Sequence, residues 1–185
     1  MPQTDLPRSG PLQTLEFRID ATQPATRELR VCAMITSPED GDVELFLPTW
    51  TPGSYLIREY SRHLSRVEAF EAGTEQPLPC LKVGKNRFRV EAPGDTRIEL
   101  RYRVYAHELS VRTADVDSCH AYWNHCCVLL WPIEQTDLPA DITIEHLKDW
   151  SLSCSLAATP ARANALGCVA STLRARDLAE ALDSP

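Results

Sequence analysis

Apolar and polar residues alternate along most of this chain, and this period of two restricts its fold more than any other feature. The longest case spans residues 97–106, where Ile98, Leu100, Tyr102 and Val104 alternate with arginine and glutamate. Successive side chains of a β-strand point to opposite faces, so the pattern predicts a strand with one buried and one wet face. Shorter segments with the same alternation are residues 15–20, 43–47, 87–90, 142–144 and 152–156.

The segments between these predicted strands are made of turn-forming residues. PEDGD, EAGTEQP, VGKN, APGD and TDLPAD contain the glycine, proline, aspartate and asparagine that are typical of turns between antiparallel strands. We therefore predict an all-β fold, an antiparallel β-sandwich or saddle of about ten strands.

Helical signals are few. Asp177 can cap a helix, with Glu180 three residues later and Pro185 as a stop, so we expect a short C-terminal helix. Apolar side chains in residues 56–64 also stand at helical spacing, which predicts one or two helical turns there.

The length of 185 residues suits one domain, because single cores typically serve roughly 100–200 residues. We expect residues 1–12 to be a disordered lead-in and residues 13–185 to form a single β-domain. The net charge of -7 argues against a nucleic-acid partner and gives no reason for binding to an anionic membrane. No apolar run approaches the roughly 18 residues of a transmembrane helix.

The cysteines point to a reducing compartment. There are seven, an odd number, and no pair has the C-x-x-C spacing. The first residues carry an acid and prolines in place of the apolar region of a signal peptide. We therefore expect reduced thiols, most of them acting as small core hydrophobes, and a cytoplasmic location.

The familiar catalytic motifs are absent from the sequence. His107-Glu108 begins like the metalloprotease motif His-Glu-x-x-His, but Val111 stands where the second histidine is needed. Both histidines of that motif must reach one zinc ion from one face of a helix, so this chain alone cannot build that zinc site.

The densest group of reactive side chains is CHAYWNHCC, residues 119–127. Cys119, His120, His125 and Cys126 are potential metal ligands there. In an extended strand Cys119 and His125 lie about 20 Å apart, and the adjacent residues His125 and Cys126 point to opposite faces of the sheet. We therefore expect a strand with buried thiols and exposed histidines that binds no metal. A metal-binding protein that uses this group stays an alternative, which elemental analysis would decide.

PTWTPGSYLIREYSRHL, residues 48–64, breaks the strand pattern. Pro52-Gly53 suits a type II turn, since proline fixes φ and glycine accepts a positive φ. Such a turn would present Trp50 and Tyr55 as packing anchors. The arginines that follow it, Arg58 and Arg62, are candidates for pairing with carboxylates inside this domain or across an interface with another.

The same stretch closely resembles the signature near the start of the glycyl aminopeptidase family, zinc metallopeptidases with a PDZ domain. The matching residues are Pro48, Trp50, Thr51, Pro52, Gly53, Ser54, Tyr55, Leu56, Ile57, Arg58, Arg62 and His63. The resemblance continues in LSVRTADVD (residues 109–117), at Tyr122 and Asn124, and in the terminal ALDSP.

This resemblance implies that the chain is the N-terminal β-domain of such an enzyme. In the family, that domain precedes a thermolysin-like catalytic domain, which carries the zinc, and a PDZ domain. The implied partners are therefore the protein's own catalytic and PDZ domains and, through them, short peptides with small N-terminal residues. The resemblance implies no cofactor within this chain.

By analogy with the wider group of zinc aminopeptidases, a loop of this domain faces the active-site cleft. The candidates for that wall are Arg112, Asp115, Tyr122 and Asn124. The chain departs from the family after Asn124, where residues 125–127 are His-Cys-Cys and the family has small residues.

Two hypotheses follow. The first is a noncatalytic accessory domain that docks on its own catalytic domain and shapes the peptide-binding cleft. The alternative is a free-standing β-sandwich module that binds a peptide or protein through residues 50–60. A reading frame that continues past residue 185 into His-Glu-x-x-His would favour the first.

Overall fold

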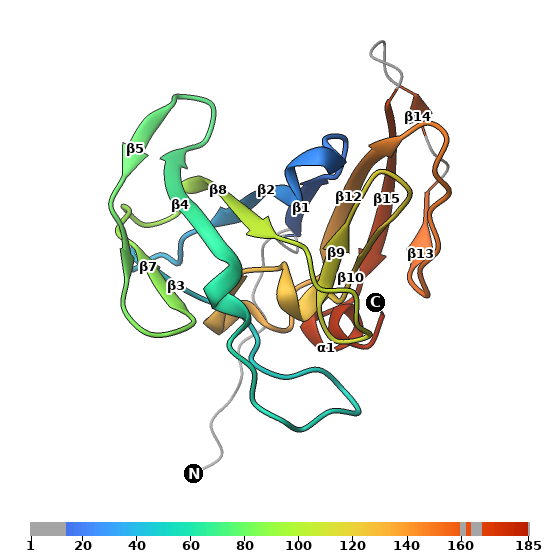
Figure 1. Cartoon of the computed structure of the whole chain (residues 1–185). Coiled ribbons are helices and arrows are strands. Elements are labelled where there is room, and N and C mark those ends of the chain that lie inside the picture. Colours follow the sequence, from blue (N-terminus) through green and yellow to red (C-terminus); the bar gives the residue numbers. More distant parts are fainter. Residues whose placement is uncertain (1–13, 160–161, 164–167, 185) are drawn as a thin grey trace.

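A computed structural model describes residues 14–159, 162–163 and 168–184 of the chain (Figure 1). The lead-in expected over residues 1–12 lies outside the described residues. Within them, strands account for most of the regular structure and the one α-helix is α1 (Leu178–Leu182) near the C-terminus. The predicted all-β class with a short C-terminal helix is therefore confirmed.

The main element is a large, curved sheet. In spatial order it contains β13 (Ala157–Ala158), β15 (Cys168–Ala175), β12 (Ala140–Leu147), β1 (Leu15–Asp20), β2 (Glu28–Thr36), β8 (Arg97–Tyr105), β4 (Leu64–Glu71) and β5 (Gln76–Leu78), and β14 (Arg162–Ala163) pairs with β15. All of these pairs are antiparallel except β1 with β12, which run parallel. The sheet is therefore mixed at its centre.

Two smaller sheets complete the fold. The four-stranded sheet has the order β11 (Trp131–Pro132), β3 (Val43–Phe46), β7 (Arg87–Val90) and β6 (Cys80–Lys82), and β9 (Ala114–Val116) pairs with β10 (Ala121–Trp123). Short 3₁₀ helices lie at Pro24–Thr26, Tyr60–His63, His125–Cys127 and Ile133–Gln135. Among the described residues, no helix has the length and apolar character needed to cross a bilayer.

The alternating patterns correspond to real strands in most places. The longest pattern is β8, whose residues alternate between half-buried and buried along its length. The segment 152–156 is the exception, because it alternates in burial but pairs with no strand. It is fixed by side chains instead: Leu156 is buried, and Cys154 Sγ donates to the Ser184 carbonyl at 3.6 Å. The alternation here corresponds to alternating burial along a segment that forms no strand.

Both helical expectations are confirmed. The side chain of Asp177 accepts a hydrogen bond from the Glu180 backbone N–H at 2.8 Å and caps α1. Residues 56–64 contain a single helical turn, the 3₁₀ helix Tyr60–His63.

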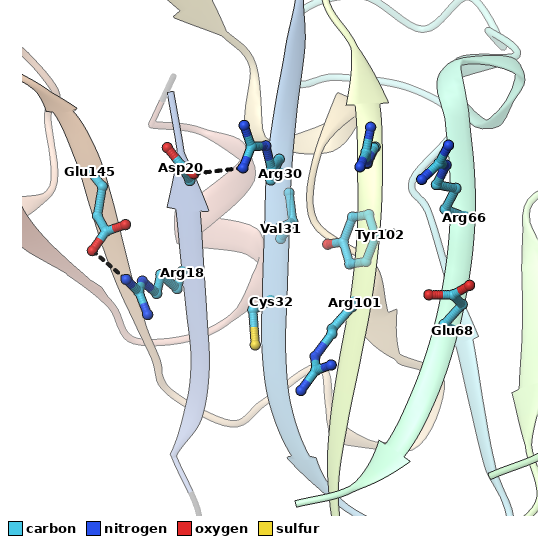
Figure 2. A pocket seen from close by; sticks show the side chains of 11 residues that line it. Arg18, Asp20, Arg30, Val31, Cys32, Arg66, Glu68, Arg101, Tyr102 and Glu145 are labelled. Atoms are coloured by element: carbon cyan, nitrogen blue, oxygen red, sulfur yellow. Dashed lines mark hydrogen bonds and ion pairs between the residues drawn. The ribbon is translucent and has the colours of Figure 1, made fainter. Parts of the chain in front are cut away.

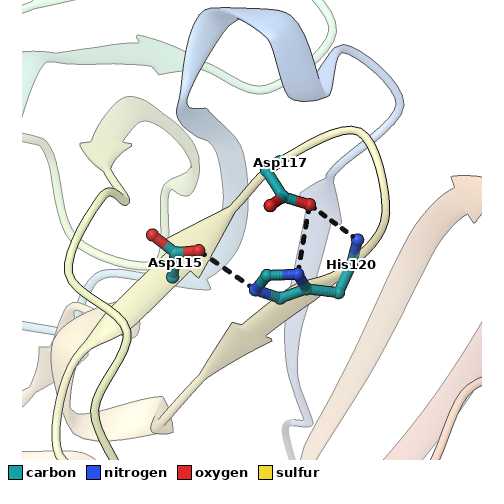
Figure 3. Close-up of side chains that lie close together, drawn as sticks. All are labelled: Asp115, Asp117 and His120. Carbon is teal, nitrogen blue, oxygen red and sulfur yellow. Dashed lines mark hydrogen bonds and ion pairs between the residues drawn. The ribbon is translucent and has the colours of Figure 1, made fainter.

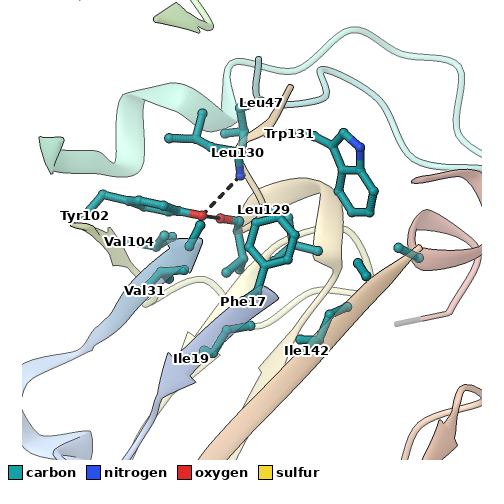
Figure 4. Packing of buried hydrophobic residues seen from close by; sticks show 14 of the residues in the cluster. Phe17, Ile19, Val31, Leu47, Tyr102, Val104, Leu129, Leu130, Trp131 and Ile142 are labelled. Carbon is teal, nitrogen blue, oxygen red and sulfur yellow. Dashed lines mark hydrogen bonds between the residues drawn. The ribbon is translucent and has the colours of Figure 1, made fainter. Parts of the chain in front are cut away.

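The core lies between the large and the four-stranded sheets and contains a buried chain segment. Residues 123–132 are all buried, from the last residue of β10 through β11, and Figure 4 shows Leu129, Leu130 and Trp131 among the packed side chains. The Trp131 ring at the end of this segment stacks on Phe17 of β1 with ring centroids 5.4 Å apart. One apolar cluster therefore joins both sheets through this segment.

A buried segment must also satisfy its backbone polar groups. The Tyr102 hydroxyl on β8 does this for two of them, since it donates to the Val128 carbonyl at 2.8 Å and accepts from the Leu130 N–H at 3.1 Å (Figure 4). The Tyr102 side chain thereby fixes the distance between residues 128–130 and the large sheet.

We expect Tyr102→Phe to destabilise the fold by about 1–3 kcal/mol, because it leaves a buried carbonyl and a buried N–H without their partner. Urea unfolding measures the change. Tyr105→Phe is the matched control, since Tyr105 is 48% exposed and its hydroxyl forms no hydrogen bond within the described residues. Its effect should stay within about 0.5 kcal/mol. Equal stability of Tyr102→Phe and wild type would contradict the role given to this hydroxyl.

Candidate functional site

A long loop between β3 and β4 projects from the domain (Figure 1). At its start, the Ser54 N–H donates to the Thr51 carbonyl at 2.9 Å and Gly53 has a φ of +77°, which is the type II turn that the sequence predicts. The Trp50 and Tyr55 rings stack on each other with centroids 6.1 Å apart. They are 44% and 85% exposed, so they pack against one another and not in the core.

The two arginines of this loop differ in their partners. Arg62 Nη2 lies 3.5 Å from Glu108 Oε2, so Arg62 pairs with a carboxylate inside this domain. The guanidinium of Arg58 pairs with no carboxylate among the described residues, and its buried Nε lacks a hydrogen-bond partner there. Of the two, only Arg62 therefore forms an ion pair within the described residues.

The four residues expected at a cleft wall come from the segment around β9 and β10. Asp115 and Tyr122 are paired across the two strands. Arg112 is exposed, and the Tyr122 hydroxyl donates to the Val111 carbonyl at 3.1 Å. Asn124 is only 3% exposed. The structure thus brings the four residues into one region but leaves only Arg112 and Tyr122 open to solvent.

Asn124 links this region to the projecting loop. Its Oδ1 accepts from the Cys126 N–H at 3.1 Å and so caps the 3₁₀ helix His125–Cys127, while its Nδ2 donates to Thr51 Oγ1 at 3.1 Å. The His-Cys-Cys sequence that distinguishes this chain is therefore compatible with a tight, capped turn.

The expectation for residues 119–127 is partly wrong. The strand β10 covers only Ala121–Trp123, Cys119 is exposed, and His125 is 2% exposed. Cys126 and Cys127 are buried as expected, and their sulfurs lie 3.7 Å apart. The chain leaves the strand at Asn124, and this bend carries the second histidine into the core.

His120 lies in a cluster that sequence reasoning did not assemble (Figure 3). Its Nε2 is 3.0 Å from Asp115 Oδ2 and its Nδ1 is 3.1 Å from Asp117 Oδ1. His107 Nδ1 lies 3.4 Å from the other oxygen of Asp115. The hydrogen bond from the Cys119 N–H, together with that from His120 N–H, lowers the pKa of Asp117. The D-x-D spacing before a histidine was the only sequence signal for this group.

A second feature lies on the wet face of the large sheet. A hollow of about 340 Å³ is lined by Arg18, Asp20, Arg30, Val31, Cys32, Arg66, Glu68, Arg101, Tyr102, Arg103 and Glu145 (Figure 2). Several of its arginines pair across strands, for example Arg18 with Glu145 at 2.7 Å and Arg103 with Glu28 at 2.9 Å. Ion pairs at a protein surface typically contribute about 0–1 kcal/mol each. These ion pairs are those expected on a solvent-facing side of a sheet, so they indicate no ligand site in the hollow.

The chain matches a family model described as the Peptidase M61 N-terminal domain over residues 16–185. Among solved structures, it is similar to an aminopeptidase N family protein from Idiomarina loihiensis, with 28% identity and a TM-score of 0.80. That match covers 92% of this chain and 28% of the other.

More distant structures share the fold. One is a variant of an M1 zinc metallopeptidase from Deinococcus radiodurans bound to the substrate Tyr-Ser-Ala, with 16% identity and a TM-score of 0.57 over 89% of this chain and 39% of that one. Among curated proteins, none matches this chain.

We expect His125 to make stability depend on pH. Burial lowers the pKa of His125 to about 4, and its Nδ1 accepts a hydrogen bond from Trp123 Nε1 at 3.2 Å. An unfolded histidine titrates near 6.5, so below that pH the unfolded chain binds the proton more readily. Stability should therefore fall by about 3 kcal/mol between pH 7 and pH 4 from this group.

Urea midpoints measured from pH 8 to pH 4.5 test this, with His125→Gln expected to show a smaller loss on acidification. His146→Gln removes another buried imidazole and keeps the contribution of His125. If His125→Gln loses stability with falling pH as steeply as wild type, the linkage is assigned to the wrong residue.

Proposed function

This chain belongs to the Peptidase M61 N-terminal domain family, and from that membership we propose that it is the noncatalytic N-terminal β-domain of a zinc aminopeptidase. In this proposal the domain docks on its own catalytic domain and shapes the peptide-binding cleft. The parent enzyme is of the glycyl aminopeptidase kind, with a PDZ domain and a cytoplasmic location, and acts on short peptides with small N-terminal residues.

The observation that carries the docking role is an exposed apolar surface on two loops. We call it the apolar loop surface, and it consists of Tyr55, Leu56, Ile57, Leu109 and Val111. These side chains are 85%, 64%, 75%, 68% and 71% exposed, in that order. Exposed apolar side chains gathered in one region of a soluble protein typically mark an interaction site.

The two loops lie close enough to act together. A small pocket is lined by Leu56 and Ile57 from the first loop and by Glu108 and Thr113 from the second. The Asn124 side chain holds Thr51 at the base of the first loop, while Cys127 Sγ donates to the Arg112 carbonyl in the second at 3.2 Å. The surface is therefore supported by the buried segment beneath it.

The occupant that we propose is the catalytic domain. The chain spans 28% of the length of the similar Idiomarina loihiensis protein, so proteins of that kind contain much more than this domain. The C-terminal helix α1 packs near the 3₁₀ helix His125–Cys127, in the region that carries the two loops (Figure 1). A domain joined after α1 would begin in that region.

The zinc of such an enzyme would be held by the catalytic domain. The described residues do not fit the metalloprotease site, because His107-Glu108 is followed by Val111 in place of the second histidine.

Within the cleft, Arg112 and Tyr122 are our candidates for direct contact with a peptide, since both reach solvent. Asp115 and Asn124 would act by positioning, because both are nearly buried. Arg58 is our candidate for an ion pair across the domain interface. A free-standing β-sandwich module would use the same apolar loop surface for a separate partner, and the reading frame beyond residue 185 separates the two.

We expect Tyr55→Ser and Ile57→Ser to weaken binding to a separately expressed catalytic domain by at least about tenfold, because apolar residues at the centre of an interface dominate its affinity. Calorimetry or surface plasmon resonance measures the dissociation constant. Leu81→Ser is the matched control, since Leu81 is 49% exposed on β6, outside both loops, and its loss should leave binding unchanged.

The isolated chain should hydrolyse neither glycyl nor alanyl anilide, with or without added zinc. Turnover by the purified chain that a chelator abolishes would overturn the noncatalytic assignment. Tight binding by both serine variants would overturn the docking surface.

A further inference from the structure

Asp115 is a carboxylate in an unusual environment. Its side chain is 8% exposed, and within the described residues no N–H or O–H group forms a hydrogen bond with good geometry to its oxygens. Its near neighbours are two imidazoles, His107 at 3.4 Å and His120 at 3.0 Å. A nearly buried carboxylate needs a compensating positive charge, which a bound cation would supply.

His120 presents a complementary problem. Its Nε2 is buried and has no hydrogen-bond partner with good geometry among the described residues, although it lies 3.0 Å from Asp115 Oδ2. Zinc binds histidine nitrogen and carboxylate oxygen at about 2.0–2.2 Å, so two of its ligand atoms stand about 3.0–3.5 Å apart. The spacing of these two atoms therefore already matches a shared metal ion.

The other nitrogen of His120 has the partner that metal-bound histidines usually have. Its Nδ1 lies 3.1 Å from Asp117 Oδ1, and that oxygen is itself held by the N–H groups of Cys119 at 2.7 Å and His120 at 3.0 Å (Figure 3). On metal binding, a hydrogen bond from Nδ1–H to this carboxylate would fix the tautomer whose Nε2 binds the ion.

We propose that His120 Nε2 and Asp115 bind a divalent transition-metal ion of the zinc class, with Asp117 orienting His120. His107 is half exposed, with its Nδ1 3.4 Å from Asp115 Oδ1, and is the candidate for a third ligand. The nitrogen donors favour zinc and its neighbours over magnesium or calcium, which prefer oxygen ligands. The potential donor atoms of Asp115, Asp117 and His120 lie within 4.8 Å of one another, so the two ligands and the orienting carboxylate form one compact group.

This site differs from the zinc site expected in a catalytic domain, because all its ligands belong to this chain. It lies at the hairpin end of β9, where the loop between β9 and β10 places His120 beside Asp115, and His107 forms a backbone bridge with Asp115. A bound ion would tie that loop to residue 107 and so hold Tyr122, which is paired with Asp115, in a fixed position.

Titration of the untagged 185-residue chain with Co²⁺ under reducing conditions tests the proposal. One ion should bind per chain and give visible d–d absorption without the near-ultraviolet charge-transfer band of a thiolate ligand, and Zn²⁺ should displace it. Asp115→Asn and His120→Asn should each weaken zinc binding at least about a hundredfold, and Asp117→Asn about 10–100-fold. Asp137→Asn and Cys119→Ser are matched controls that should leave affinity unchanged.

Circular dichroism of each variant without metal separates lost ligands from lost folding. If a variant is unfolded, the site is located in the wild-type chain by NMR. Bound Co²⁺ should broaden the signals of the His107 and His120 rings through its paramagnetism. Three results would overturn the proposal: no binding up to about 1 mM metal, far weaker than structural zinc sites; a thiolate charge-transfer band; or wild-type affinity in folded His120→Asn.

Discussion

The burial of residues 123–132 between two sheets is the constraint on which the rest of this structure depends. A segment of irregular backbone in a core must find a partner for each polar group, and here the partners come from side chains far away in sequence. Tyr102 serves the Val128 carbonyl and the Leu130 N–H, and Asn124 caps the turn that begins the segment. The stacking of Trp131 on Phe17 then joins the far end to β1. Packing and hydrogen bonding therefore fix the segment together.

The same segment connects the core to the exposed loops. Asn124 binds Thr51 at the base of the projecting loop, and Cys127 binds the carbonyl of Arg112 in the neighbouring loop. Loops that carry exposed apolar side chains would be poorly placed for a specific partner if they were free to move, because ordering them on binding costs free energy. A fixed base with exposed tips reduces that cost. The proposed docking role and the buried segment are in this way parts of one arrangement.

Much of the fold could be predicted from local patterns, because alternation and turn chemistry are local. The pattern over residues 97–106 became β8, and Asp177 with Glu180 caps α1 as expected. Pairing partners could not be predicted. Nothing in the sequence of residues 152–156 indicates that no strand edge lies beside it, and nothing in β1 indicates that its neighbour β12 runs parallel. Both depend on contacts between segments that are distant along the chain.

The candidate sites divide in the same way. The sequence by itself determined the strand pattern, the turn at Pro52-Gly53, the lack of a second histidine after His107-Glu108 and the motif that carries the family resemblance, since these are properties of neighbouring residues. Only the tertiary structure decided which side chains meet. The bend at Asn124 carried His125 into the core, and the β9–β10 hairpin returned His120 to Asp115. Distances between non-neighbouring side chains arise when strands pair and pack, so no spacing along the chain could have supplied them.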